Sequence, residues 1–161
     1  MKKLTLSLFA LASVFAALAA PKTIIKYDFE DAQNQNIKTW DKKPIEIVDA
    51  KQAAGGSKHA IKISSISYFA TNSITETGTY EYSIDSKYIW GKDGELKVMC
   101  LNKKTNNFDL IVTEIIKQES TYSTTTAKFK VKEGGYYRFV ITPGGQGGNL
   151  LVDNVTVKKV K

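Results

Sequence analysis

The stretch AKFKVKEGGYYRFVI, residues 127–141, decides the fold class of this 161-residue chain. Apolar side chains and lysines alternate over 127–132, and apolar side chains return at every second position in Tyr137, Phe139 and Ile141. Successive side chains of a strand point to opposite faces, so a period of two is typical of half-buried β-strands. The sequence Glu-Gly-Gly at 133–135 is typical of a turn. The stretch therefore predicts two β-strands separated by a turn.

The same alternation recurs along most of the chain beyond residue 20. It predicts further strands at 23–30, 44–48, 58–63, 80–85, 95–100, 108–117 and 149–157, with turn residues between most of them. The last of these is apolar on both faces near its start, as expected for a central strand. No segment shows the 3.6-residue period of an amphipathic helix. About nine short strands spaced in this way predict an all-β, single-domain antiparallel β-sandwich.

The glycine-rich stretch at 143–148 allows two interpretations. A phosphate-binding loop would have to open a helix, and here a strand follows. We therefore expect its glycines to permit a tight, positive-φ return between two strands.

Residues 1–19 differ in composition from the rest of the chain. Lys2 and Lys3 precede an apolar stretch that ends at Leu18, and Ala17 and Ala19 occupy the −3 and −1 positions of a cleavage site. This pattern predicts a secretory signal peptide at 1–19 and a mature domain at 20–161. The protein is then secreted and located outside the cell, in the periplasm or at the cell surface. The lysine-rich, nearly arginine-free composition favours a bacterial source.

Composition excludes several classes of site. Cys100 is the only cysteine and His59 the only histidine, so intramolecular disulfides and multi-histidine metal sites are excluded. No apolar run after residue 20 approaches the roughly 18 residues that span a bilayer. Residues 20–161 carry 21 basic and 16 acidic side chains, and Arg138 is the only arginine. The lysines are dispersed, so we attribute the charge to solubility and predict no nucleic-acid partner.

Four motifs occur in an order that points to one family. They are TIIKYDFEDA (23–32) with Trp40 after it, GGSKHAIKISS (55–65), TYEYSIDSKYIW (79–90) and FKVKEGGYYRFVITPGGQGGNLLVDNVTV (129–157). In this order they resemble the jelly-roll carbohydrate-binding modules of the galactose-binding-like superfamily. The resemblance implies a jelly-roll sandwich that binds a glycan without cleaving it, on a concave sheet face or a rim of loops.

A sugar ring packs its apolar C–H face on an aromatic ring, while its hydroxyls need hydrogen-bond partners. This chemistry selects six candidate ligand-binding residues: Trp40, Tyr68, Tyr88, Trp90, Tyr136 and Arg138. Tyr88 and Trp90 share one face of an extended chain, and so do Tyr136 and Arg138. The alternative interpretation is structural, with Trp40 packed under the N-terminal loop, Tyr68 at the edge of the core, and Tyr136 and Arg138 simply facing solvent.

The resemblance also implies a structural calcium ion. In the family, this ion lies between the first strand, the loop before the Gly-Ser strand and an aspartate of the last strand. Here these positions are Glu30 and Asp153, with backbone carbonyls near Ser57 and Lys58. Calcium prefers several oxygen ligands of mixed type. Ordinary polar strand ends are the alternative interpretation of the two acids.

Enzymatic chemistry has little support in the sequence. His59 lies on the apolar face of its strand, and Cys100 alternates with Leu96 and Val98 as a buried hydrophobe would. No nucleophile motif is present, so we predict no catalysis. The sequence favours a secreted, non-catalytic module that binds a poly- or oligosaccharide through exposed aromatic residues. The first alternative is a structural or adhesive surface protein that uses the same sandwich for self-association or for a cell-surface partner; the second is a small glycan-active enzyme.

Overall fold

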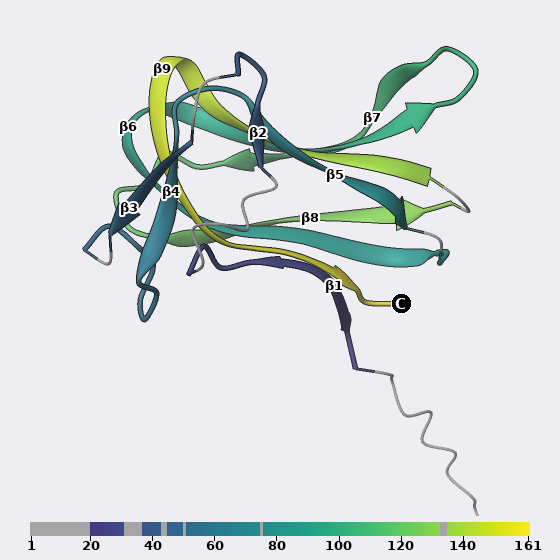
Figure 1. Ribbon diagram of the computed structural model, residues 1–161, viewed down its shortest axis with the longest axis horizontal. Helices are drawn as coiled ribbons and strands as arrows, with labels where there is room; N and C mark the ends of the chain where they lie inside the picture. Colours follow the sequence, from purple (N-terminus) through teal and green to yellow (C-terminus); the bar gives the residue numbers. More distant parts are fainter. Residues whose placement is uncertain (1–19, 31–36, 43–44, 50, 75, 133–134) are drawn as a thin grey trace, which may run out of the picture.

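The computed structural model describes residues 20–30, 37–42, 45–49, 51–74, 76–132 and 135–161, so the predicted signal peptide lies outside it. The described residues form nine β-strands and no helix (Figure 1). The strands are β1 (Lys22–Tyr27), β2 (Lys38–Thr39), β3 (Glu46–Asp49), β4 (His59–Ile63), β5 (Ser67–Ile74), β6 (Gly78–Asn102), β7 (Asn107–Ile116), β8 (Ser123–Val131) and β9 (Gly135–Lys159). The prediction of an all-β chain is confirmed. No helix in the described residues is long and apolar enough to cross a membrane.

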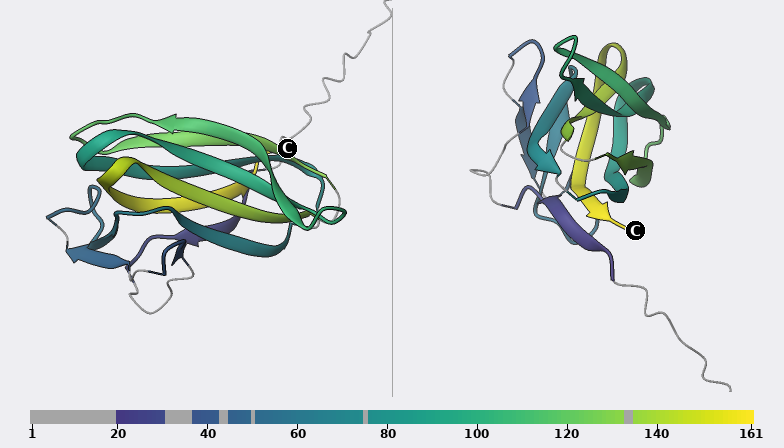
Figure 2. Two further views of the ribbon diagram at one scale, coloured as in Figure 1. Left: turned by 90° about the horizontal axis from the view of Figure 1, so that it is seen from above. Right: turned by 90° about the vertical axis from the view of Figure 1, so that its right-hand side faces the viewer.

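Two sheets arise because β6 and β9, each 25 residues long, bend near their middles. The first sheet has the order β2-β5-β9-β6-β7 and uses residues 135–142 of β9 and 95–102 of β6. The second sheet uses the other halves of β9 and β6, with β8 on one side and β1, β4 and β3 on the other. All pairs are antiparallel, and the two sheets lie against each other (Figure 2). The predicted antiparallel β-sandwich is confirmed.

Aromatic side chains from both sheets meet in the core. Phe139 of the first sheet contacts Tyr82 of the second, with ring centroids 5.0 Å apart. Phe129 of β8 lies 5.7 Å from Phe139 and 5.8 Å from Tyr137. Each of these side chains is at most 4% exposed, and burial of one large apolar side chain contributes about 1.5–3 kcal/mol. The period-two pattern thus places one face of each strand in a shared core.

Glycines permit the bend at which β6 and β9 cross. Gly91 has a φ of +136°, which side-chain-bearing residues rarely adopt. A Cβ on Gly144 would lie 2.0 Å from the carbonyl oxygen of Lys92, and one on Gly148 would lie 2.4 Å from the carbonyl oxygen of Gly144. Gly144 and Gly148 themselves do not have positive φ. The expected positive-φ return at 143–148 is therefore wrong for these two glycines, which instead allow two backbones to approach closely.

The strands bring one further difference and one confirmation. β5 was not predicted, because SYFATNSI does not alternate apolar and polar residues. Residues 149–157 do form part of a central strand, since β9 pairs on both sides. Its Leu151 packs with Val48 and Ala60 in a second, small apolar cluster, which explains the apolar character of both faces.

Candidate functional site

The outer face of the first sheet brings four of the six predicted ligand-binding residues together. Tyr136 and Arg138 face outward because Tyr137 and Phe139, which alternate with them on β9, are buried. Tyr68 of β5 pairs with Val140 of β9, the strand that carries Tyr136 and Arg138. On its other side β5 pairs with β2. The prediction that Tyr136 and Arg138 share the face away from the core is confirmed.

Trp40 follows β2 and lies over β5. Its backbone N–H donates a hydrogen bond to the carbonyl oxygen of Ile66, at 2.8 Å, which fixes the chain next to β5. Its indole ring meets the ring of Tyr68 edge-on, with centroids 5.5 Å apart and planes at 65°. The Trp40 side chain is nevertheless 54% exposed. The chain therefore holds this indole in place while much of its surface stays open to solvent.

The guanidinium group of Arg138 lies among three aromatic rings. Its central carbon is 3.8 Å from the ring centroid of Phe108, 4.7 Å from that of Tyr68 and 5.5 Å from that of Trp40. Cation–π contacts of this kind contribute roughly 0.5–2 kcal/mol each. The Nε atom of Arg138 is buried and has no hydrogen-bond partner among the described residues. This N–H is therefore an unsatisfied donor beneath the surface of the face.

Phe108 belongs to this face but was not among the predicted site residues. It lies at the start of β7, and its ring centroid is 5.8 Å from that of Tyr136. We call Trp40, Tyr68, Phe108 and Tyr136 around Arg138 the aromatic platform. Its members come from β5, β7, β9 and the residue after β2, and the rings of Phe108 and Trp40 lie at most about 9 Å apart because both contact the Arg138 guanidinium group.

Polar groups lie beside the platform. Lys97 of β6 pairs with Val140 and Glu95 with Thr142, so both share the outward face with Arg138, and their side chains form an ion pair. Val140 is buried between Tyr68 and Lys97 and forms part of the floor. The face therefore offers aromatic surface, an apolar floor, and both donors and acceptors.

Tyr88 is not part of an exposed platform, and this prediction was wrong. Its side chain is 6% exposed and belongs to the core, and burial raises the pKa of its hydroxyl. The inward alternation of Tyr80, Tyr82 and Ile84 continues through Ser86 to Tyr88. The hydroxyl of Tyr88 accepts a hydrogen bond from the N–H of Gly144, at 3.4 Å, beneath the bend of β6.

Trp90 lies two residues farther along but does not face the same way. A register shift between Tyr88 and Trp90 marks the bend of β6, and Trp90 is 51% exposed beside Ile89, which is 50% exposed. Trp90 pairs with Asn149, far along β9 from Arg138. The two tryptophans therefore belong to separate parts of the surface.

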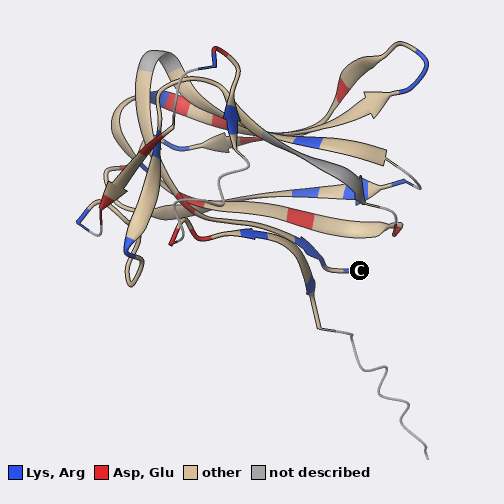
Figure 3. Cartoon of the chain, in the orientation of Figure 1, with Lys and Arg blue, Asp and Glu red and all other residues tan. Residues whose placement is uncertain are grey.

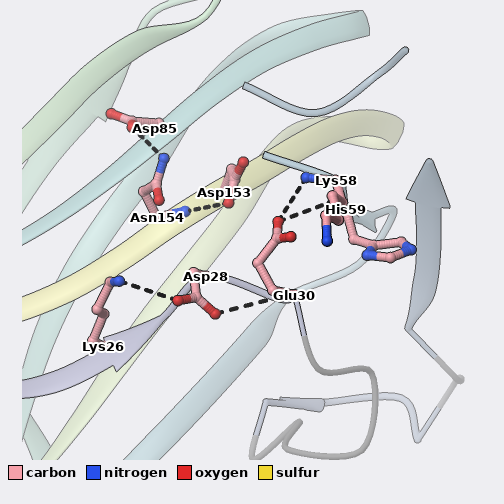
Figure 4. Close-up of polar contacts among 8 residues, drawn as sticks. All are labelled: Lys26, Asp28, Glu30, Lys58, His59, Asp85, Asp153 and Asn154. Carbon is pink, nitrogen blue, oxygen red and sulfur yellow. Dashed lines mark hydrogen bonds and ion pairs between the residues drawn. The ribbon is translucent and has the colours of Figure 1, made fainter. Parts of the chain in front are cut away.

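The predicted metal ligands converge on one loop from two sides (Figure 4). Glu30 accepts hydrogen bonds from the backbone N–H groups of Lys58 and His59, at 2.7 and 3.3 Å. Asp153 accepts one from the N–H of Ala54, at 3.2 Å, and another from Asn154, at 2.7 Å. A positive φ of 57° at Phe29 lets that side chain enter the core while Glu30 reaches this loop.

Asp153 is a buried carboxyl group beside a second acid. It is fully buried, and burial followed by repulsion from Asp85 raises the pKa of its carboxyl group. Asn154 joins the two acids, since its Nδ2 donates to Asp85 at 3.0 Å. No lysine or arginine of the described residues forms an ion pair with Asp153. Within the described ranges no three His, Cys, Asp or Glu side chains cluster, so any cation here needs backbone oxygens as well.

The remaining candidates for chemistry stand apart from the platform. His59 is half-buried on β4, as predicted. Cys100 packs against the core, as predicted for a buried hydrophobe, but it is only half-buried and lines a cavity of about 510 Å³. Leu101, Leu110 and Ile111 also line this cavity, together with Lys103, Lys130 and Lys132. None of the predicted ligand-binding residues lines it.

The fold matches solved carbohydrate-binding domains. The CBM22-1 xylan-binding domain of Xyn10C from Paenibacillus barcinonensis superposes with a TM-score of 0.67 at 13% identity, over 88% of this chain and 97% of that one. The C-terminal family 22 carbohydrate-binding module of Xyn10B from Clostridium thermocellum gives 0.64 at 13% identity, over 88% and 96%. The K1 cleaved adhesin domain of Lys-gingipain from Porphyromonas gingivalis gives 0.57 at 14%, over 84% and 97%.

Sequence comparison adds no relative, since no family model and no curated protein matches the chain. At identities this low, the structural likeness establishes the fold alone. The chain thus has the β-sandwich fold of carbohydrate-binding modules, as the sequence motifs predicted.

Proposed function

We propose that the protein is a non-catalytic module that binds a poly- or oligosaccharide on the outer face of its first sheet. The aromatic platform supports this proposal most strongly. Sugar rings stack their C–H faces on Trp40 and Tyr68 at one end and on Phe108 and Tyr136 at the other. Arg138 lies between the two ends and donates to hydroxyl or ring oxygens of the sugar.

The fold gives this proposal its second support. Two of the matched domains are described as xylan-binding or carbohydrate-binding, and one is described as an adhesin domain. A site on an open sheet face also suits a polymer better than a small molecule, because small ligands are usually enclosed in a pocket. The cavity that Cys100 and Tyr137 line shares no residue with the platform.

Secretion belongs to the same proposal. A signal peptide at 1–19 directs the chain out of the cytoplasm. Outside the cytoplasm the protein can meet extracellular polysaccharide. The dispersed charge agrees with a free protein, since lysines and acids are interspersed along the strands (Figure 3). A protein of this kind holds a glycan without chemical change, so incubation with its ligand releases no reducing sugar.

Affinity electrophoresis tests the proposal. The mature protein, residues 20–161, is run through native gels that contain xylan, β-glucan or mannan. Retardation by at least one polysaccharide, with no reducing sugar released, supports a non-catalytic binder. Unretarded migration in every gel, by a protein with a folded β-sheet circular dichroism spectrum, contradicts it and favours an adhesive role through protein contacts.

A structural calcium ion between Glu30, Asp153 and the loop at 54–59 is the second part of the proposal. The two carboxylates already converge on this loop, and the buried charge of Asp153 lacks a nearby cation among the described residues. A calcium ion would supply the missing positive charge beside Asp153 and would bind the first and last strands to the loop. It acts on stability, since a ligand of the folded state raises the free energy of unfolding by mass action.

A further inference from the structure

A cavity lies on the side of the sandwich where β7 and β8 are the outermost strands of the two sheets. Within the described ranges each of these strands pairs with β6 alone. The cavity has a volume of about 510 Å³, and small-molecule sites typically enclose roughly 300–1,000 Å³. It is lined by residues of both sheets, such as Ile111 of β7 and Lys130 of β8. The cavity therefore lies between the edges of the two sheets.

Aliphatic residues of this cavity are open to solvent. Leu110 is 56% exposed and Ile111 45%. A β-bulge occurs here, because Leu110 pairs with Met99 and Val112 with Val98, which leaves Ile111 as the extra residue of β7. Bulges re-aim side chains and are frequent beside functional sites. An apolar ligand would cover aliphatic surface that water now contacts, which favours binding.

The floor of the cavity belongs to the core. Tyr137 is 2% exposed, and Cys100 packs against the core. The hydroxyl of Tyr137 accepts a hydrogen bond from the backbone N–H of Lys132, at 3.3 Å. This bond holds the residue that follows β8 beside the cavity. The floor thus fixes the backbone position of one of the charged residues that line the cavity.

The charge on the cavity has one sign. Among the described residues that line it, none is acidic and three are lysines: Lys103, Lys130 and Lys132. They belong to the end of β8 and to the turn between β6 and β7, which are both basic (Figure 3). None of them forms an ion pair with another described residue. Asp109, which precedes the cavity residues of β7, already accepts a hydrogen bond from Nδ2 of Asn102, at 2.9 Å. The cavity therefore combines apolar surface with positive charge that lacks a described counter-ion.

We propose that this cavity binds a small amphipathic anion, namely a single hydrocarbon chain that ends in a carboxylate. The chain lies on Tyr137 and against Leu110 and Ile111, where it removes apolar surface from water. The carboxylate lies among the lysine ammonium groups, which attract it. A cationic head group of similar size would meet only like charges. The site is independent of the proposed glycan binding, because it shares no residue with the aromatic platform.

Protection of Cys100 tests the proposal directly, because this residue is the only cysteine of the chain and lines the cavity. Its alkylation by iodoacetamide, an uncharged reagent, is followed by mass spectrometry. Decanoate, at concentrations at which it forms no micelles, should slow the alkylation at least fivefold and in a saturable manner. Decyltrimethylammonium, which has a chain of the same length and a cationic head, should leave the rate unchanged. Equal protection by the two amphiphiles would overturn the proposal.

Two matched pairs of variants locate the ligand by isothermal titration calorimetry with decanoate. Ile111→Ser should weaken binding roughly fivefold, whereas Ile115→Ser, at a similarly exposed position of β7 that does not line the cavity, should not. Lys130→Gln should weaken binding roughly threefold, whereas Lys128→Gln, on the same face of β8 but not on the cavity, should not. No binding of decanoate by wild type, or equal effects within either pair, would refute the site. Polysaccharide should retard Ile111→Ser and wild type equally, because the two sites are separate.

Discussion

Trp40 and Trp90 are almost equally exposed, by 54% and 51%, but their surroundings differ. Trp40 touches Tyr68 edge-on and lies near the guanidinium group of Arg138. Trp90 lies at the bend of β6, and within the described ranges its ring has neither an aromatic nor a cationic neighbour. The comparison teaches that exposure alone does not identify a sugar-stacking residue. Neighbours that fix the ring and add a donor are needed as well.

The largest expected effect follows from removal of the fixed indole. Trp40→Ala should weaken polysaccharide binding by on the order of 30-fold or more, as truncation of a tryptophan hot spot costs about 2 kcal/mol or more. Trp90→Ala should change the affinity less than twofold. Affinity electrophoresis of the two variants in parallel gels measures both. The comparison fails if Trp90→Ala is the variant that loses retardation.

Tyr68 and Tyr88 sharpen the comparison in terms of stability. Tyr88→Ala removes a core ring and should destabilise the fold by about 3–5 kcal/mol, as for other large aromatic side chains. Tyr68→Ala, on the outer face, should lose binding with a much smaller change in stability. Urea unfolding and binding titrations of the two variants separate these effects. A Tyr88→Ala protein of wild-type stability would contradict the placement of Tyr88 in the core.

Arg138 tests whether the donor matters as well as the rings. Arg138→Lys keeps the positive charge but loses the planar group that lies against Phe108 and Tyr68. We expect it to bind roughly 10-fold more weakly, because a cation–π or charged hydrogen-bond contact contributes about 1–2 kcal/mol. Lys97→Ala, a change of another cation on the same face, should have the smaller effect. Isothermal titration calorimetry with a soluble oligosaccharide compares them.

The smallest effect concerns calcium and pH. The pKa of Asp153 is raised in the folded state, so its ionised form costs stability above that pKa unless a cation binds. A chelator should lower the melting temperature of wild type at pH 7, and less so near pH 4, where a proton competes with the metal. Asp153→Asn should show no chelator effect at either pH. Identical melting curves of wild type with and without chelator at pH 7 would refute the calcium proposal.

The sequence predicted most of the fold because alternation reports directly which face of a strand is buried. The sequence also contained the evidence that Tyr88 points into the core, since the inward alternation of Tyr80, Tyr82 and Ile84 extends to it. β5 was not predicted because its apolar and polar residues do not alternate. The length of β6 and β9 was not predicted either, because it depends on close backbone approaches at Gly94 and Gly144 that no local sequence pattern reveals.

The candidate site was predictable in part. Tyr136 and Arg138 could be assigned to one face from their spacing alone. Phe108 could not be added to them, because its contact with Arg138 depends on how the β6–β7 hairpin folds back beside β9. Contacts between residues that are 30 positions apart arise from strand order and curvature, which period-two patterns do not specify.

One measurement tests the central claim most directly. Residues 20–161 contain two tryptophans and a single arginine, so a ¹H–¹⁵N spectrum of this segment resolves two indole signals and one arginine Nε–H signal. Titration with an oligosaccharide of the polysaccharide that retards the protein should shift the signals of Trp40 and Arg138 and leave that of Trp90 in place. A shift of Trp90 alone would contradict binding on the aromatic platform.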